Sequence, residues 1–329
     1  MRAIISGVGH YTPEQRLTNK DLEKTLETND EWITSRTGIK ERRILDKDKG
    51  ASYMAVRAAK AVLEQANISA EEIDLIIVAT TTPDMFFPST ASIVQNELKA
   101  NNCWGFDLGA GCSGFIFALA TASQFIETGR HKKILVIGSD KMSSILNYDD
   151  RNSCILFGDG AGAVLLEPSD EDGLGIKDFM FHIDGSGGKY LFMEAGGSLH
   201  PATHKTVEKK MHYLSQDGKT IFKYAVTEMT NVSKKLMEKN NITHENIKLL
   251  IPHQANKRII DSVAKKLNLN EDQVVINIEK YGNTTAGTIP IAMSEAYQEN
   301  RINKGDQLLI SAFGTGFSWG SLLFKWAID

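Results

Sequence analysis

A glycine-rich segment with a single cysteine leads directly into an apolar run with helical spacing: Asp107-Leu108-Gly109-Ala110-Gly111-Cys112-Ser113-Gly114-Phe115-Ile116-Phe117. Glycine allows the backbone to turn sharply and a ligand to come close. We therefore expect Cys112 at the first turn of a helix that runs into the core. The free N–H groups and positive end of such a helix favour thiolate, which lowers the pKa of a thiol. The pattern predicts a nucleophile, and the alternative is a small buried thiol of the core.

Composition indicates an ordinary globular protein. The chain has 329 residues, 42% hydrophobic and 24% charged, with a net charge of −4, and nothing in this balance indicates a nucleic-acid partner. The three cysteines, Cys103, Cys112 and Cys154, are too few for a disulfide framework and fit a reducing compartment. Residues 1–10 lack the pattern of a signal peptide, and no apolar run is long enough to span a bilayer. We expect a cytoplasmic protein with no membrane partner.

Short apolar runs rich in β-branched residues alternate with amphipathic segments, which predicts an α/β fold. The expected strands are 3–8, 73–79, 134–137, 154–157, 163–166, 249–251, 274–278 and 308–310. The expected helices are 19–28, 30–37, 52–65, 224–240, 255–266 and 288–298. Residues 168–188 are acidic, rich in glycine and weakly periodic, so we interpret them as the join between two halves.

The second half repeats the first. Residues 67–77 parallel residues 241–251 with an offset of 174 (Ile247 against Ile73), and residues 134–137 parallel 308–311 with the same offset. Two matches at one offset predict a duplicated α/β unit, with an N-terminal half of residues 1–170 and a C-terminal half of residues 171–329. Pseudo-symmetry then brings loops after equivalent strands together.

Two residues of the second half could work with Cys112. His253 follows the expected strand 249–251, and active-site groups gather at such strand ends in α/β proteins. Asn283 lies between glycines just before the helix 288–298, near residue 286, the counterpart of Cys112. The alternatives are a strand-end histidine with its polar groups satisfied and an asparagine that caps a helix. We favour a shared site on symmetry-related loops.

Three other patterns are weaker evidence of function. The sequence Gly158-Asp159-Gly160-Ala161-Gly162 resembles a phosphate cradle, but it lies between two expected strands, so a tight turn is the prediction. No Cys/His pairs have zinc spacing, so no metal is expected, and Cys103 and Cys154 are assigned to the core. A Cys–His–Asn order also occurs in papain-like proteases, and the separation of 141 residues (253 − 112) fits them, although their local signature is absent.

The chain resembles β-ketoacyl-acyl-carrier-protein synthase III nearly from end to end. The motifs that carry the resemblance are Gly111-Cys112-Ser113-Gly114-Phe115, Pro252-His253-Gln254-Ala255-Asn256, Gly282-Asn283-Thr284, Ala312-Phe313-Gly314-Thr315-Gly316-Phe317-Ser318-Trp319-Gly320, and the segments 32–39 and 157–162. The resemblance implies a thiolase-like fold, in which two duplicated α/β halves form a layered αβαβα core.

The resemblance also implies an acyltransferase that initiates type II fatty-acid synthesis. Cys112 would take the acyl group of acetyl-CoA, and decarboxylation of malonyl-acyl carrier protein would supply the attacking carbanion. His253 and Asn283 would donate hydrogen bonds to the thioester oxygen. Backbone N–H groups of Cys112 and of the loop Gly314, Thr315 and Gly316 would form an oxyanion hole. Such chemistry needs no cofactor, and the family acts as a homodimer.

Further roles are implied position by position. The CoA-binding residues would be Trp32, Arg36, Arg151, Gly218, Phe222 and Asn256. Phe87 would close the acyl pocket across the dimer interface, and its bulk favours a short primer. A basic patch for the acidic carrier protein would consist of Lys223, Arg258, Lys265 and Lys266. The alternatives are surface packing and salt bridging for Trp32, Arg36 and Arg151, and an ordinary solvated face for the basic patch.

The sequence departs from the family pattern at two positions near the nucleophile and in one segment. Thr315 stands where the family usually has glycine, Gly111 stands where alanine is common, and residues 168–211 match poorly. These departures leave the identity of the primer open. Three other functions stay open: an alkylquinolone- or resorcinol-type synthase with a different primer, a cysteine-dependent thioester hydrolase, and a binding protein without catalytic activity.

Overall fold

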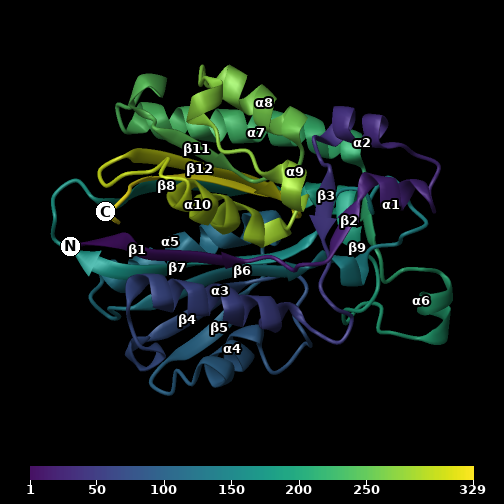
Figure 1. The fold of residues 1–329 in the computed structure, drawn as a ribbon, viewed down its shortest axis with the longest axis horizontal. Helices are drawn as coiled ribbons and strands as arrows, with labels where there is room; N and C mark the ends of the chain where they lie inside the picture. The colour runs from purple at the N-terminus through teal and green to yellow at the C-terminus, as the bar shows by residue number, and fades with distance from the viewer.

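The computed structural model describes residues 1–329, which form five layers (Figure 1). From top to bottom in that view these are a helix layer, a sheet, a central helix layer, a second sheet and an outer helix layer. The helices of the layers are α7 (Gly218–Lys239) and α8 (Lys257–Lys266) on top, α5 (Gly114–Glu127) and α10 (Thr288–Gln298) in the centre, and α3 (Ala51–Ala66) and α4 (Thr90–Leu98) below. This is the predicted thiolase-like αβαβα core.

The first sheet has the order β1-β7-β6-β4-β5. Strand β4 is parallel to β5 and β6, whereas β7 runs antiparallel to both β6 and β1. Its strands are β1 (Arg2–Tyr11), β4 (Leu75–Ala79), β5 (Trp104–Leu108), β6 (Ile134–Lys141) and β7 (Asp159–Ser169). Strand β5 has a neighbour on one side only, so it forms an edge of the sheet.

The second sheet has the order β11-β12-β13-β8, which repeats the order β4-β6-β7-β1. Its strands are β8 (Gly175–Ile183), β11 (Leu249–Pro252), β12 (Gln307–Gly314) and β13 (Ser318–Lys325). The offset of 174 places β4 on β11 and the start of α5 on that of α10. Strand β8 lies inside residues 168–188, so the expectation of a mere join there is wrong. These residues form the counterpart of β1 despite their weak periodicity.

The central helices bury side chains from both halves in one apolar cluster. Phe115 and Ile116 of α5 pack there with Ile289 and Met293 of α10. Because α5 faces a sheet on each side, its apolar residues are not confined to one stripe. No helix combines the length and the apolar character needed to cross a membrane.

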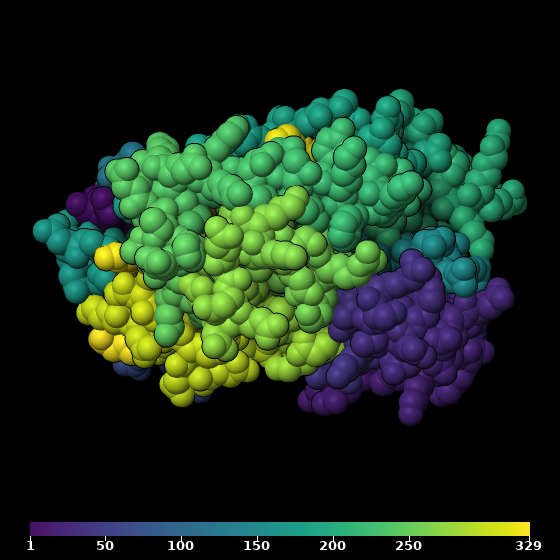
Figure 2. Space-filling view, turned by 90° about the horizontal axis from the view of Figure 1, so that it is seen from above, coloured from purple at the N-terminus to yellow at the C-terminus, as the bar shows by residue number.

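Shorter elements gather at one end of the layers. They are β2 (Arg16–Thr18), α1 (Asn19–Glu23), α2 (Asp30–Thr37), β3 (Glu41–Arg43), β9 (Leu191–Met193), α6 (His204–Glu208), β10 (Leu214–Gln216) and α9 (Ile278–Tyr281). Seven 3₁₀ turns complete the set: η1 (Ala70–Glu72), η2 (Gly111–Ser113), η3 (Met142–Ile145), η4 (Gly185–Tyr190), η5 (His244–Asn246), η6 (Glu271–Gln273) and η7 (Thr285–Gly287). In Figure 2 the purple N-terminal segment lies beside the yellow-green α8, where Asn256 Nδ2 donates to Arg36 O at 3.1 Å.

Three predicted elements differ from the structure. Residues 154–156 form turns, and Phe157 keeps a single bridge to Asn283. The buried guanidinium of Arg42 donates to the carbonyl of Ile155, which a strand would use. Residues 274–278 keep a single bridge, Leu250 to Val274, and then enter α9. The helix expected over 19–28 ends at Glu23.

The predicted turn at Gly158–Gly162 is also wrong, since β7 begins at Asp159. The glycines there make room for the second half. A Cβ on Gly158 would lie 2.3 Å from Tyr281 O, and one on Gly162 would lie 2.6 Å from Ile291 N. The glycine spacing therefore reflects close packing between the halves. These glycines do not form a phosphate cradle.

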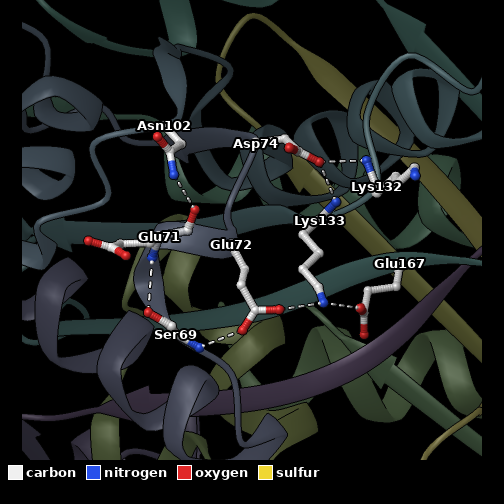
Figure 3. A network of polar contacts seen from close by, with 8 residues as sticks. All are labelled: Ser69, Glu71, Glu72, Asp74, Asn102, Lys132, Lys133 and Glu167. Carbon is white, nitrogen blue, oxygen red and sulfur yellow. Dashed lines mark hydrogen bonds and ion pairs between the residues drawn. The ribbon is translucent and has the colours of Figure 1, made fainter.

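A polar network ties together the turns that precede the parallel strands (Figure 3). Asp74 accepts hydrogen bonds from the backbone N–H groups of Lys132 at 2.7 Å and Lys133 at 2.9 Å. Lys133 Nζ lies 3.0 Å from Glu72 and 3.2 Å from Glu167. The network sits at the N-terminal ends of β4 and β6, so the carboxyl ends of these strands are left for the active site.

Candidate active site

Cys112 lies in η2, between β5 and α5, as the glycine pattern predicts. Gly111 has a φ of +55°, a left-handed conformation that favours glycine. Gly314 packs directly on the nucleophile, since a Cβ at this position would lie 2.9 Å from Cys112 N. No residue accepts a hydrogen bond from the N–H of Cys112, so this donor is available to a ligand.

His253 follows β11, and its backbone N–H donates to Ser311 O at 2.8 Å. The ring is buried, with Nδ1 2.7 Å from Thr288 Oγ1. The Thr288 hydroxyl donates to Thr285 O at 3.0 Å, and a hydroxyl has one hydrogen to give. With the hydroxyl hydrogen on Thr285 O, Nδ1 carries the ring proton and Nε2 keeps a free lone pair; with that hydrogen on Nδ1, Nε2 carries the proton. Burial lowers the pKa of His253 to about 3, so the ring is neutral at physiological pH.

Asn283 lies between α9 and η7. Its Oδ1 accepts a hydrogen bond from the N–H of Thr285 at 2.9 Å, and its own N–H donates to Leu156 O at 2.8 Å. These bonds fix the carboxamide and leave Nδ2 without a partner in the protein. Thr285 has a φ of +54°, so η7 reproduces the left-handed turn that Gly111 makes in η2. The symmetry-related loops therefore share their backbone conformation.

Cys112, His253 and Asn283 line one cavity of about 270 Å³. Most of its wall is apolar and comes from both halves: Met142, Ile145, Leu156, Phe157, Leu191, Phe192, Met193, Leu214, Ile221, Phe222, Ala225, Met229, Ala255, Ile259 and Phe313. A few polar groups at one end of an apolar pocket are typical of a small-molecule site. Nowhere do three or more His, Cys, Asp or Glu side chains gather as metal ligands.

The lowered thiol pKa expected for Cys112 is wrong. Burial raises the pKa of Cys112 to about 12, and the negative charge of Asp140 acts in the same direction. The thiol is 8% exposed and the neighbouring His253 is neutral, so no positive charge offsets the loss of water. At physiological pH the sulfur is therefore a neutral thiol, and its proton must be transferred as the sulfur attacks.

The predicted oxyanion loop divides between two hollows. Gly314 and Thr315 line the cavity of Cys112. Gly316 does not, and instead lines an adjoining apolar hollow with Phe117, Phe181 and Phe317.

The residues predicted to bind CoA also fall into two groups. Gly218, Phe222 and Asn256 line the cavity. Trp32, Arg36 and Arg151 lie outside it. The guanidinium carbons of Arg36 and Arg151 are 4.9 Å and 5.4 Å from the Trp32 ring centroid. A base held between Trp32 and Arg151 needs two contacts of about 3.5 Å each, so Arg151 must move away for the predicted sandwich to form.

The four basic residues predicted to receive a carrier protein are exposed on α7 and α8, and none of them forms an ion pair. Arg258 lies 5.3 Å from the ring centroid of Phe222, which connects this basic patch to the cavity. Phe87 is 85% exposed and does not line the cavity of its own chain. Its predicted role depends on a second copy of the chain and stays a prediction.

Sequence reasoning missed Asp140 and Thr288. The offset of 174 pairs Cys112 with Ala286 and Asp140 with Gly314. The Asp140 carboxylate accepts a hydrogen bond from the N–H of Ala286 at 3.1 Å, whereas Gly314 has no side chain to occupy the N–H of Cys112. The N–H of Ala286 is therefore occupied, whereas the symmetry-related N–H of Cys112 is free. The repeat could have revealed this pair, because the offset itself was readable.

Comparisons with known proteins identify the family of this chain. Residues 106–185 match the family model 3-oxoacyl-[acyl-carrier-protein] synthase III, and residues 237–326 match the model of its C-terminal part. A β-ketoacyl-[acyl-carrier-protein] synthase III of Chlorobaculum tepidum is 53% identical over 99% of this chain and 100% of that protein.

Two solved structures show the same architecture. A 3-oxoacyl-[acyl-carrier-protein] synthase III of Aquifex aeolicus superposes with a TM-score of 0.90 and 45% identity, over 98% of this chain and 100% of that one. The priming β-ketosynthase of the R1128 polyketide pathway superposes with a TM-score of 0.91 and 32% identity, over 99% and 96%. This chain belongs to the β-ketoacyl-acyl-carrier-protein synthase III family of condensing acyltransferases.

Proposed function

We propose that this protein condenses a short acyl-CoA, with acetyl-CoA favoured, with malonyl-acyl carrier protein. The products are 3-oxoacyl-acyl carrier protein, CoA and CO₂. The observation that carries this proposal is the single cavity in which a thiol, a neutral imidazole and a carboxamide meet from the two halves of the chain.

In the first half-reaction, Cys112 Sγ bonds to the acyl carbon and the carbon–sulfur bond to CoA breaks. The free lone pair of His253 Nε2 accepts the thiol proton and passes it to the departing CoA sulfur. The oxyanion of the tetrahedral intermediate accepts a hydrogen bond from the unpartnered N–H of Cys112. The proton moves while the carbon–sulfur bond forms, because a ring with a pKa of about 3 cannot take the proton of a thiol with a pKa of about 12 beforehand.

In the second half-reaction, the bond between the malonyl carboxylate and its α-carbon breaks, and CO₂ leaves. The electron pair moves onto the thioester oxygen, where the free Nδ2 of Asn283 donates a hydrogen bond. His253 donates from Nε2 in its other tautomer, for which the Thr288 hydroxyl turns from Thr285 O to Nδ1. The α-carbon attacks the acyl-Cys112 carbonyl, the carbon–sulfur bond breaks, and the sulfur takes up a proton from water. No step calls for a metal or a redox cofactor.

The same proposal includes two macromolecular partners. The unpaired cations Lys223, Arg258, Lys265 and Lys266 would receive an acidic carrier protein beside the cavity. A second copy of the chain would cover β5, an edge strand that carries the half-exposed Trp104. It would also bury the exposed Phe86 and Phe87. The three free cysteines support a reducing compartment such as the cytosol.

The direct test is to incubate the protein with acetyl-CoA and malonyl-acyl carrier protein and to weigh the products. We expect acetoacetyl-acyl carrier protein, and we expect Cys112→Ser to form none of it. Undiminished condensation by Cys112→Ser contradicts the proposed nucleophile. Thioester cleavage without a malonyl-dependent product supports a hydrolase instead. A preference for long or aromatic acyl-CoA supports a secondary-product synthase.

A further inference from the structure

The two departures from the family pattern near Cys112 contact each other. A Cβ built on Gly111 would lie 2.5 Å from Thr315 Cγ2 and 3.2 Å from Thr315 N. Carbon atoms pack at about 3.5–4.0 Å, so residue 111 cannot carry a side chain while residue 315 is threonine in this position. The methyl group of Thr315 thus fills the space that an alanine at position 111 would use.

Thr315 also anchors a segment of the cavity wall. Its Oγ1 donates a hydrogen bond to Leu191 O at 2.8 Å. Leu191 begins β9, which pairs with β10, and Leu191, Phe192, Met193 and Leu214 all line the cavity. Glycine at position 315 cannot make this bond, so the threonine supplies an attachment that the usual family residue lacks.

Thr315 separates two hollows. It lines the cavity of Cys112 on one side and the apolar hollow of Phe117, Phe181 and Phe317 on the other. Within the loop 314–316, Thr315 and Gly316 line that hollow and Gly314 does not. Its side chain is therefore part of the wall between the two hollows.

We propose that Thr315, in the space left by Gly111, is a specificity-determining residue that restricts the acyl group on Cys112 to short chains. It does so by holding β9 over the cavity through Leu191 and by closing the way to the neighbouring hollow. This inference rests on the proposed function, because it concerns the acyl group that Cys112 receives.

The test follows acylation of Cys112 by intact-protein mass spectrometry with acetyl-, butyryl-, hexanoyl- and octanoyl-CoA. We expect Thr315→Gly to raise the octanoyl-to-acetyl rate ratio at least about tenfold, the size of effect that a changed apolar pocket gives. Thr315→Ser keeps the bond to Leu191 and is expected to shift the ratio less than Thr315→Val, which keeps the shape and loses the bond. An unchanged ratio in folded Thr315→Gly overturns the inference.

Thermal unfolding tests the contact between the two residues independently of substrate. We expect Gly111→Ala to lower Tm more in the presence of Thr315 than in the Thr315→Gly background, because the clash is then gone. Equal losses in both backgrounds contradict the paired packing. If the wild-type protein forms no acyl-Cys112 with any acyl-CoA, the proposed function fails. If Cys112 is acetylated normally but Thr315→Gly has the same octanoyl-to-acetyl rate ratio as the wild type, this inference alone fails.

Discussion

The carboxylate of Asp140 and the backbone N–H of Ala286 lie 3.1 Å apart and join the end of β6 to the turn that precedes α10. The other carboxylate oxygen accepts hydrogen bonds from the N–H groups of Thr81 at 2.8 Å and Thr82 at 3.1 Å. One fully buried side chain therefore holds a loop of the first half against the loop of Asn283 in the second.

Asp140→Asn should weaken both folding and catalysis. An amide has one acceptor oxygen, so a buried N–H loses its partner, which costs about 1–3 kcal/mol. We expect a lower free energy of unfolding and a lower condensation rate, measured by urea denaturation and product formation. Asp149→Asn, at the exposed ion pair with Lys210, is the matched control and should cost less than about 1 kcal/mol. Wild-type stability and rate in Asp140→Asn contradict the role given to this contact.

Alkylation of Cys112 should report a protonated resting thiol. Because burial raises its pKa to about 12, the thiolate fraction rises about tenfold per pH unit through the neutral and mildly alkaline range. Rates with iodoacetamide, with the label located on Cys112 by mass spectrometry, should increase in this way without a plateau. A plateau at about pH 7–8 contradicts the raised pKa and favours an activated thiolate.

His253 should contribute to acid sensitivity. Its folded-state pKa of about 3 lies below the value of about 6.5 in the unfolded chain, so the unfolded state binds more protons between these values. The stability linked to this group is present above pH 6.5 and is lost as pH falls toward 3. We expect the free energy of unfolding to fall less over this range in His253→Gln than in the wild type. Parallel curves for the two proteins contradict the buried neutral ring.

Removal of the Thr288 hydroxyl should affect the chemistry more than the fold. Thr288→Val keeps the shape but leaves His253 Nδ1 without its partner, so the ring loses its orientation and its choice of tautomer. We expect a loss of about tenfold to a hundredfold in malonyl decarboxylation, less than the roughly hundredfold to thousandfold effect of losing an oxyanion donor itself, because the imidazole remains. Thr288→Ser should restore most of the rate. Equal rates in the valine and serine variants contradict the assignment.

Reversal of charge on α8 should weaken carrier-protein binding selectively. Lys265→Glu combined with Lys266→Glu should raise the KM for malonyl-acyl carrier protein about tenfold through lost electrostatic attraction. Acylation by acetyl-CoA should be unchanged. Lys234→Glu with Lys235→Glu, on the exposed face of α7, is the matched control. A similar rise in KM in the control indicates a general charge effect and no defined docking surface.

The positions of the reactive groups were readable from the repeat. The offset of 174 relates η2 to η7 and β4 to β11, and it places Cys112, His253 and Asn283 on neighbouring loops. Family membership and the layered fold were likewise predictable, because the motifs around these residues are specific. The helices Asp30–Thr37 and Thr288–Gln298 were also predicted with their observed bounds.

The environment of Cys112, His253 and Asn283 could not be predicted from the sequence. The pKa of Cys112 depends on water excluded by Gly314 and by the apolar cavity wall, which no local pattern reports. The glycines at 158–162 suggested a turn, since nothing near them in sequence shows that Tyr281 and Ile291 pack against them. Strand β8 was missed because its partner β13 lies far along the chain, and pairing overrides a weak local signal.

The central pair of helices makes the two halves interdependent. Each of α5 and α10 covers apolar side chains contributed by the opposite half, and Gly175 at the start of β8 sits against the backbone of Ala3. Cleavage of the chain between residues 170 and 171 would give two fragments, each of which exposes apolar core side chains to water. Neither fragment would persist alone, and activity would return only through their co-expression. The two duplicated halves therefore fold and function only as one unit.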